Sequence, residues 1–179
     1  MEKEKIIQLF IEGNRVGFDK IYEAYSSGMY SICLRYLRCD DDAQDVLQES
    51  FIKIYNSRES FDITKPIGAW IKTITIRTAI NYIRKNYKHE LVDDERRFEV
   101  LQPEHSEVED TDDLKNKLTR VLQKLPEGYR IVFQMYAIEN LTHKEIASYL
   151  GVTEGTSKSQ YSKAKKMIQN LLDQKKMAS

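Results

Sequence analysis

The chain has 179 residues, with 28 Lys and Arg against 28 Asp and Glu, and 41% of its residues are hydrophobic. This length allows one large domain or two small ones. No apolar run is long enough to span a bilayer and residues 1–5 are too charged to open a secretory signal, so we expect a cytoplasmic protein. Cys33 and Cys39 are the only cysteines and have no second pair or nearby histidine, which predicts two reduced thiols and no metal site.

The net charge of zero is the sum of three segments that differ in charge. Residues 1–92 carry 14 Lys and Arg against 13 Asp and Glu, residues 93–113 carry 2 against 10, and residues 114–179 carry 12 against 5. The middle segment has few apolar side chains to bury and many negative charges that repel each other, so we predict an acidic flexible linker between two domains. Apolar residues recur mostly at spacings of three and four, with only seven glycines and three prolines. The predicted fold is therefore all-α, with two small helical domains.

A predicted helix begins at the aspartates of positions 40–42, whose carboxylates favour the positive end of the helix dipole and can cap exposed amides. Its buried stripe, at helical spacing, should comprise Ala43, Leu47, Phe51, Ile54 and Tyr55. Another face carries Asp45, Gln48, Glu49 and Ile52. Composition alone favours a merely solvated surface for this second face.

Residues 57–66 form a predicted loop rich in hydrogen-bonding side chains, with Phe61 in its middle. Loops of this kind can hold an unstacked base. Phe61 can equally plug the end of the helical bundle, and the residues alone favour that plug.

The next predicted helix spans residues 68–88, with Ile76, Ile80, Ile83 and Tyr87 on its packing arc. A separate arc forms a basic stripe of Thr73, Arg77, Asn81, Arg84 and Lys88, with Lys72 and Lys85 nearby. Such a stripe can follow a nucleic-acid backbone. Trp70 lies on the same side, where it could stack on a base or anchor the helix, and burial is the default for a lone tryptophan.

Two short helices joined by a glycine turn are predicted within residues 142–167. Thr142 and Glu145 match a capping box, Gly151 permits the positive φ of a sharp exit, and Thr153 and Thr156 can cap the second helix. This order is typical of a helix-turn-helix that reads DNA.

The second of these helices has two contrasting faces. Its inner stripe should comprise Ser157, Tyr161, Ala164, Ile168 and Leu171. Small or long polar residues that fit a major groove make up the outer face: Gly155, Ser159, Ser162 and Lys166, flanked by Lys158, Lys163 and Gln169. The alternative is a solvated lysine face on an ordinary C-terminal helix, which the preceding capped helix and glycine turn make less favoured.

No catalytic apparatus is recognisable. His89, His105 and His143 lie far apart, and none stands beside a Ser or Cys in a nucleophile context. We therefore expect no enzyme activity, cofactor or small-molecule substrate.

Several motifs, in order, resemble region 2 of extracytoplasmic-function sigma factors, of the sigma-70 family: DAQDVLQESF at 42–51, AWI at 69–71 and INYIRK at 80–85. LPEGYRIVF at 125–133, HKEIA at 143–147 and GTSKSQ at 155–160 look like region 4, especially in the form common in Bacteroidota. The resemblance covers residues from about 15 to 172 apart from the acidic segment, because several separate motifs occur in the right order.

The resemblance implies a transcription initiation factor that joins core RNA polymerase, carries it to selected promoters and helps to open the DNA. Residues 1–92 would be region 2, 93–113 the linker and 114–179 region 4. Asp45, Gln48, Glu49 and Ile52 would bind the clamp helices of the largest catalytic subunit, and region 4 would bind the flap of the second. The linker would thread the polymerase near the RNA path, where its charge could imitate nucleic acid.

The resemblance also assigns DNA contacts. The loop from Phe61 to Lys65 would capture a flipped base of the downstream element, and the basic stripe would hold the nearby backbone. The full downstream set is Phe61, Asp62, Lys65, Trp70, Arg77, Asn81, Arg84, Lys85 and Lys88. The upstream set, which includes Arg130 and Lys144 as phosphate contacts, is Arg130, Lys144, Thr156, Lys158, Ser159, Ser162, Lys163 and Lys166.

Two positions depart from the family pattern. Ile76 and Arg77 stand where the family commonly has an Arg-Asn pair, and Ser157 stands where many relatives outside the Bacteroidota have an aliphatic residue. The family also implies an anti-sigma partner, which is often membrane-anchored.

The main rival is a stand-alone helix-turn-helix regulator that occupies operators. It explains the carboxy-terminal half equally well, but it leaves the Asp45 face and the helix around Trp70 without a purpose. An enzyme with an attached DNA reader is less favoured still.

Overall fold

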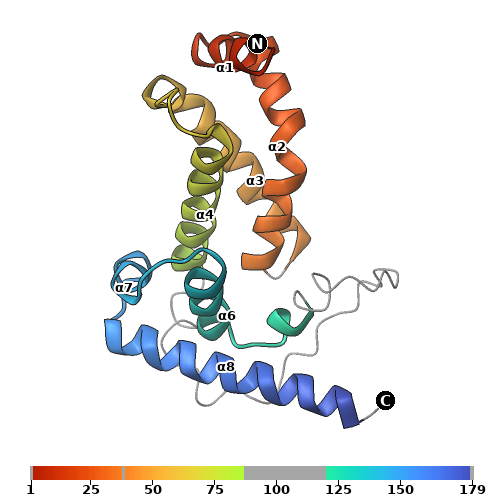
Figure 1. The fold of residues 1–179 in the computed structure, drawn as a ribbon, viewed down its shortest axis with the longest axis vertical. Coiled ribbons are helices and arrows are strands. Elements are labelled where there is room, and N and C mark those ends of the chain that lie inside the picture. Colours follow the sequence, from red (N-terminus) through yellow and green to blue (C-terminus); the bar gives the residue numbers. More distant parts are fainter. Residues whose placement is uncertain (1, 38, 87–119, 178–179) are drawn as a thin grey trace. The chain divides into compact units, whose positions relative to one another are not determined.

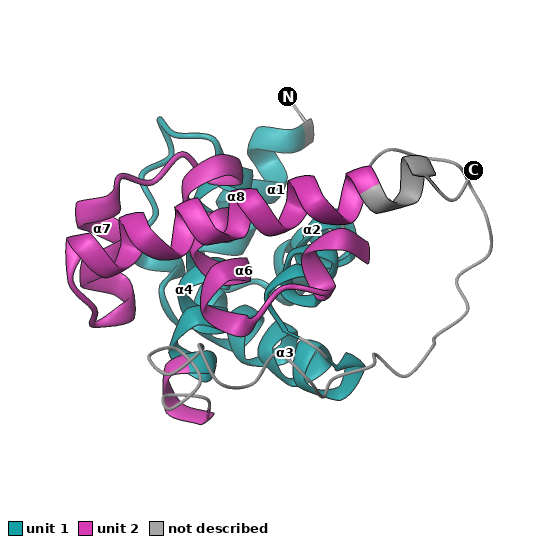
Figure 2. Cartoon of the chain, turned by 90° about the horizontal axis from the view of Figure 1, so that it is seen from below, with its two compact units in different colours: residues 1–83 teal, residues 84–179 magenta. Residues whose placement is uncertain are grey.

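A computed structural model describes residues 2–37, 39–86 and 120–177, with the side chains of residues 2 and 174–177 left aside. These residues form helices, turns and loops without a strand, which confirms the predicted all-α class (Figure 1). The chain divides into two compact units, residues 1–83 and 84–179 (Figure 2). The predicted acidic linker at 93–113 lies outside the described residues, so the boundaries at 92 and 114 stay predictions.

The first unit is built from four α-helices and one short 3-10 turn among its described residues. They are α1 (Glu2–Ile11), α2 (Arg15–Tyr36), α3 (Asp40–Asn56), η1 (Arg58–Ser60) and α4 (Ile67–Asn86), whose last turn falls on the far side of the division at residue 83. Figure 1 shows these helices in red to yellow-green. The core of this unit draws on every one of the α-helices: Phe10, Ile21, Ile32, Tyr36, Phe51, Ile54, Ile71, Ile80 and Ile83 are all buried.

Helix α3 begins where predicted, but its cap is not a carboxylate. Cys39 is the N-cap residue, and its Sγ accepts a hydrogen bond from the Asp42 amide at 3.4 Å. The three aspartates occupy the first turn, where their charge suits the helix dipole. Both cysteines are free, and burial raises the pKa of Cys33 to about 12.

The predicted buried stripe of α3 is confirmed for Ala43, Leu47, Phe51 and Ile54, while Tyr55 is half-buried. Val46 and Ser50 are also buried, so α3 is enclosed over a wider arc than one stripe. The Ser50 hydroxyl donates to the carbonyl of Val46 at 2.6 Å, which satisfies this polar group inside the core.

Helix α4 follows Pro66 and packs through Ile76, Ile80 and Ile83, as predicted. The Tyr82 hydroxyl donates to Asp42 Oδ1 at 2.6 Å and so ties α4 to the start of α3. Tyr87, the fourth member of the predicted arc, lies outside the described residues.

The second unit contains α6 (Glu127–Phe133), the π-helical turn η2 (Gln134–Ile138), α7 (His143–Leu150) and α8 (Glu154–Met177). Its core joins Val121, Leu122, Leu125, Tyr129 and Ala164, with Phe133, Ile138, Met167, Ile168 and Leu171 packed against it. Of the inner stripe predicted for α8, Ala164, Ile168 and Leu171 therefore face this core. Helix α8 is longer than the short helix predicted, because it continues to residue 177.

The predicted helix-turn-helix is present in α7 and α8. The Thr142 hydroxyl accepts from the Glu145 amide at 3.3 Å, and Glu145 Oε2 accepts from the Thr142 amide at 2.8 Å, which completes the capping box. Gly151 ends α7 at φ 69°, in the left-handed region that favours glycine. At the start of α8, Thr153 Oγ1 accepts from the Thr156 amide at 3.0 Å.

We expect Thr142→Ala to lower the free energy of unfolding of the second unit by about 1 kcal/mol, because the first turn of α7 loses its cap. The hydrogen bond from the Thr142 hydroxyl holds the pKa of Glu145 below its usual 4.5. The stabilisation that this carboxylate contributes is therefore complete above pH 4.5, and it is lost as the pH falls through the lowered pKa of Glu145 in the folded protein. Thermal unfolding of both proteins between pH 7 and pH 3 measures the difference. A difference that stays constant over this range would contradict the role of Glu145.

Candidate functional site

The face of α3 predicted to bind a partner is exposed. Asp45, Gln48, Glu49 and Ile52 all point away from the core, and 61% of the Ile52 surface is accessible. Glu49 forms an ion pair with Lys53, one turn later on the same helix, at 2.6 Å. Such an exposed pair adds little to stability and leaves both groups accessible to a partner. The face thus combines carboxylates with an accessible apolar side chain.

An apolar groove adjoins this face, and the sequence pattern did not predict it. Its volume is about 610 Å³, and it is lined by Gly13, Arg15, Phe18, Tyr22, Gln48, Phe51, Ile52, Tyr55 and Asn56. The aromatic rings contact each other edge-on, with centroids 4.7 Å apart for Tyr22 and Phe51 and 5.4 Å apart for Phe18 and Tyr55. Gln48 and Ile52 therefore belong both to the exposed face and to the wall of the groove.

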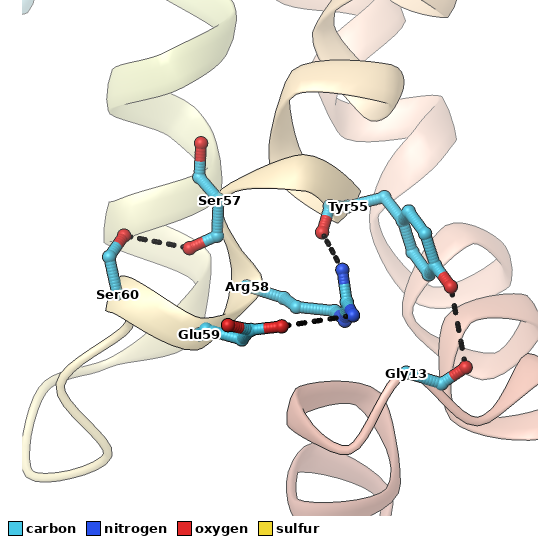
Figure 3. Close-up of polar contacts among 6 residues, drawn as sticks. All are labelled: Gly13, Tyr55, Ser57, Arg58, Glu59 and Ser60. Carbon is cyan, nitrogen blue, oxygen red and sulfur yellow. Dashed lines mark hydrogen bonds and ion pairs between the residues drawn. The ribbon is translucent and has the colours of Figure 1, made fainter.

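Arg58 connects the end of α3 to the turn between α1 and α2 (Figure 3). Its Nη1 donates to the Tyr55 carbonyl at 3.0 Å, its Nη2 pairs with Glu59 at 3.2 Å, and its guanidinium lies 4.5 Å from the centre of the Tyr55 ring. The Tyr55 hydroxyl in turn donates to the carbonyl of Gly13 at 3.4 Å. Gly13 has φ 76°, and a Cβ there would lie 3.1 Å from the guanidinium, so both the backbone and the close approach favour glycine. These contacts hold one wall of the groove and the start of the following loop.

The structure contradicts the DNA contact that the resemblance assigns to Phe61. Only 7% of its surface is accessible, and its ring centroid lies 5.1 Å from that of Trp70. Trp70 is half-buried and also meets Phe10 edge-on at 6.5 Å. The three rings form the plug that the residues alone favoured, because burying Phe61 removes a large apolar side chain from water. Phe61 is therefore not available to stack on a base in this structure.

The exposed part of the loop is residues 62–65. Asp62 Oδ1 accepts from the amide and the hydroxyl of Thr64 at 3.0 and 2.6 Å, and Lys65 lies 3.6 Å from Oδ2. The Thr64 hydrogen bonds, and secondarily Lys65, lower the pKa of Asp62, so this turn carries a carboxylate. Ile63, which the sequence reasoning did not single out, is 55% exposed between them.

The basic stripe on α4 is exposed where the structure describes it. Thr73, Arg77, Asn81 and Arg84 lie on the solvent side, and so does Lys85. Their spacing of three and four places them along one face of the helix. Lys88, the last member of the predicted stripe, lies outside the described residues.

The outer face of α8 is open to solvent over its first half. The accessible side chains are Lys158, Ser159, Ser162, Lys163 and Lys166, and Thr156 is half-buried. Lys144, at the start of α7, is exposed as well. Lys158 pairs with Glu154 at 2.7 Å, and this contact lowers the pKa of the Glu154 carboxyl.

The structure also contradicts the phosphate contact that the resemblance assigns to Arg130. Its side chain is fully buried, and Nη2 lies 2.6 Å from Oε1 of Glu127, which is 4% exposed. Two opposite charges at i and i+3 on α6 can pair locally, and because both are out of water the loss of either partner would be costly. Arg130 is thus an internal structural residue here, not an exposed phosphate contact.

Both units match models of one protein family. Residues 21–89 match Sigma-70 region 2 and residues 115–168 match Sigma-70 region 4. The RNA polymerase sigma factor SigV of Bacillus subtilis (strain 168) is 30% identical over 144 residues, which cover 80% of this chain and 84% of that protein. This chain belongs to the family of RNA polymerase sigma factors. The ECF RNA polymerase sigma factor SigW of the same organism is 28% identical over 96% of this chain and 97% of its own, and its name supports the extracytoplasmic-function group.

The fold of this sigma factor is similar to that of chains in two solved complexes. The sigma factor RpoE, in its co-crystal structure with the anti-sigma factor NepR from Bartonella quintana, superposes with a TM-score of 0.53 and 21% identity over 87% of this chain and 96% of that one. CnrH, in complex with the cytosolic domain of CnrY, gives a TM-score of 0.51 and 20% identity over 97% of this chain and 98% of its own.

Among the residues that the structure describes, none of the helices is both long and apolar enough to cross a membrane.

Proposed function

We propose that this sigma factor binds core RNA polymerase through the exposed face of α3 and directs it to promoters through two separate DNA-binding surfaces. The observation that carries the proposal is the accessible Ile52, which lies on the same face as the carboxylates of Asp45 and Glu49 and beside an apolar groove. A regulator that only reads DNA needs no such face, whereas a factor that docks on a large protein does.

The partner of the α3 face would be the clamp helices of the largest catalytic subunit. Asp45 and Glu49 suit a basic partner, and complementary charge speeds association and fixes the register of docking. Ile52 and the groove would receive apolar side chains of the polymerase, which supply affinity once buried. The second unit would contact the flap of the second catalytic subunit.

The downstream promoter element would meet the loop at 62–65 and the stripe on α4. The exposure of Asp62, Ile63 and Lys65 supports base capture at the tip of the loop, with Ile63 offering the apolar contact that Phe61 does not. Arg77, Asn81, Arg84, Lys85 and Lys88 would hold the neighbouring backbone, with Trp70 fixing the start of α4.

The upstream element would be read by the outer face of α8 in the major groove. Lys158, Ser159 and Ser162 would reach base edges, and Lys144 and Lys166 would contact phosphates. Residues 114–179 carry 12 Lys and Arg against 5 Asp and Glu, which suits binding driven by counterion release.

The organisation along the chain is part of the same proposal. The matched regions end at residue 89 and begin again at 115, which supports domains at 1–92 and 114–179 with a linker at 93–113. The GTSKSQ sequence at 155–160 supports a Bacteroidota-like form of region 4. A factor of this kind works in the cytoplasm beside polymerase and DNA, and it performs no chemistry of its own.

The first experiment combines the purified chain with bacterial core polymerase and genomic promoter fragments, and maps the starts of the transcripts. We expect discrete starts that core polymerase alone does not make. Tight binding of the free chain to duplex DNA without new transcripts would instead establish a stand-alone regulator.

An anti-sigma partner is also proposed, as RpoE has in NepR. Its target would be the exposed Ile52 and Tyr22 beside the groove, because an inhibitor that covers them would exclude polymerase. Affinity capture of the chain from cells that grow without stress should yield such a partner. Recovery of polymerase subunits alone, both by capture and by co-expression, would contradict the proposal.

A further inference from the structure

The inner face of the DNA-reading helix contains a buried hydroxyl. Ser157 has no accessible surface, and it is the buried residue of the first turn of α8, where residues 154–156 are exposed or half-buried. Its Oγ lies 2.9 Å from Nδ1 of His143, the first residue of α7. One hydrogen bond therefore joins the start of α7 to the start of α8, while the turn at Gly151 connects the end of α7 to that same start of α8.

Aromatic rings from two further positions hold the imidazole in place. The ring of Tyr136 stacks on His143 with centroids 4.3 Å apart and planes 14° apart, and Tyr161 meets it edge-on at 5.7 Å. Tyr136 belongs to the π-helical turn η2, and Tyr161 lies one turn beyond Ser157 on α8. Because η2, α7 and α8 all contact this ring, its orientation is set by the fold and not by its own rotamer preference.

The bonded face and the DNA-facing side of α8 are opposite each other. Successive residues of a helix are about 100° apart, which puts Ser159, Ser162 and Lys166 within about 40° of the point opposite Ser157. Farther along α8, Ala164 and Ile168 hold the helix against the core. In the first turn of α8, Ser157 makes the corresponding contact through its hydrogen bond to His143. Loss of this hydrogen bond would let the start of α8 rotate and would move Lys158 and Ser159.

We infer that His143 is a positioning residue that sets the orientation of the DNA-reading end of α8 through its hydrogen bond to Ser157. It acts on base preference at the upstream element without touching DNA. The inference rests on the proposed function of α8.

Three variants of the full chain, in holoenzyme with core polymerase, test this role. His143→Phe keeps a ring on Tyr136 but leaves the buried Ser157 hydroxyl without its partner; Ser157→Ala removes the hydroxyl; the double variant removes both. Transcription from a promoter and from its single-base upstream variants gives the discrimination ratio of each protein. Ser148→Ala, an exposed serine of α7, is the matched control.

We expect discrimination to fall about tenfold in His143→Phe and about threefold in Ser157→Ala, because the hydroxyl left without its partner in the first variant is fully buried, whereas the imidazole left in the second is only half-buried and can reach water. The double variant should recover to the level of Ser157→Ala, and the control should match the wild type. Unchanged base preference in His143→Phe, even with lower thermal stability, would overturn the inference, and so would a double variant worse than both single ones. A wild-type holoenzyme indifferent to the upstream sequence would instead contradict the proposed function of α8.

Discussion

Replacement of Asp45, Gln48 and Glu49 by alanine is expected to weaken binding to core polymerase by about 100-fold. These side chains are exposed on one face of α3, and their removal changes no buried contact. Central polar residues of an interface contribute both complementary charge and specific hydrogen bonds, so a triple truncation removes several kcal/mol, about 3 on this estimate. Titration of core polymerase into the labelled protein measures the loss. The variant should retain its wild-type helicity.

A second triple variant, on α8, separates promoter choice from binding to core polymerase. With Lys158, Ser159 and Ser162 replaced by alanine, we expect core binding at wild-type affinity and loss of promoter choice, because these residues lie on the outer face of α8. Replacement of Asp19 and Glu23, two exposed carboxylates of α2, provides a charge-matched control for the α3 variant. Equal loss of core binding and promoter choice in both variants would contradict the division of labour.

Replacement of Arg130 by methionine should lower the free energy of unfolding of the second unit by about 3–5 kcal/mol. Met preserves much of the side-chain volume but leaves the Glu127 carboxylate, which is 4% exposed, without the guanidinium 2.6 Å away. Removing the guanidinium takes away the positive charge 2.6 Å from a carboxylate that is out of water, and loss of one side of a buried ion pair is strongly destabilising. Amide hydrogen exchange of the full chain measures the effect unit by unit.

A double variant, Glu127→Gln with Arg130→Met, tests the cause of this loss. We expect it to be more stable than Arg130→Met alone, since the neutral amide of Gln replaces the buried charge of Glu127. If the double variant is as unstable as the single one, packing and not charge explains the effect. Loss of DNA affinity in Arg130→Met that exceeds its unfolded fraction would restore a phosphate contact for this residue.

Local patterns in the sequence determined much of this protein. The capping box of Thr142 and Glu145, the left-handed Gly151 and the buried stripe of α3 from Ala43 to Ile54 follow from spacing and residue type. Helical periodicity decides which residues share a face, and caps act within a few positions of the chain. The exposed faces around Asp45, Arg77 and Ser159 were predictable for the same reason.

Only the tertiary structure decided what each face meets. Periodicity does not say that Phe61 packs on Trp70, that Arg58 approaches Gly13, or that Arg130 is enclosed with Glu127. The hydrogen bond between His143 and Ser157 joins residues fourteen apart, and it depends on the angle between two helices. Such contacts are set by packing between elements, where one aromatic ring or one charge is buried only if its neighbours from other helices close around it.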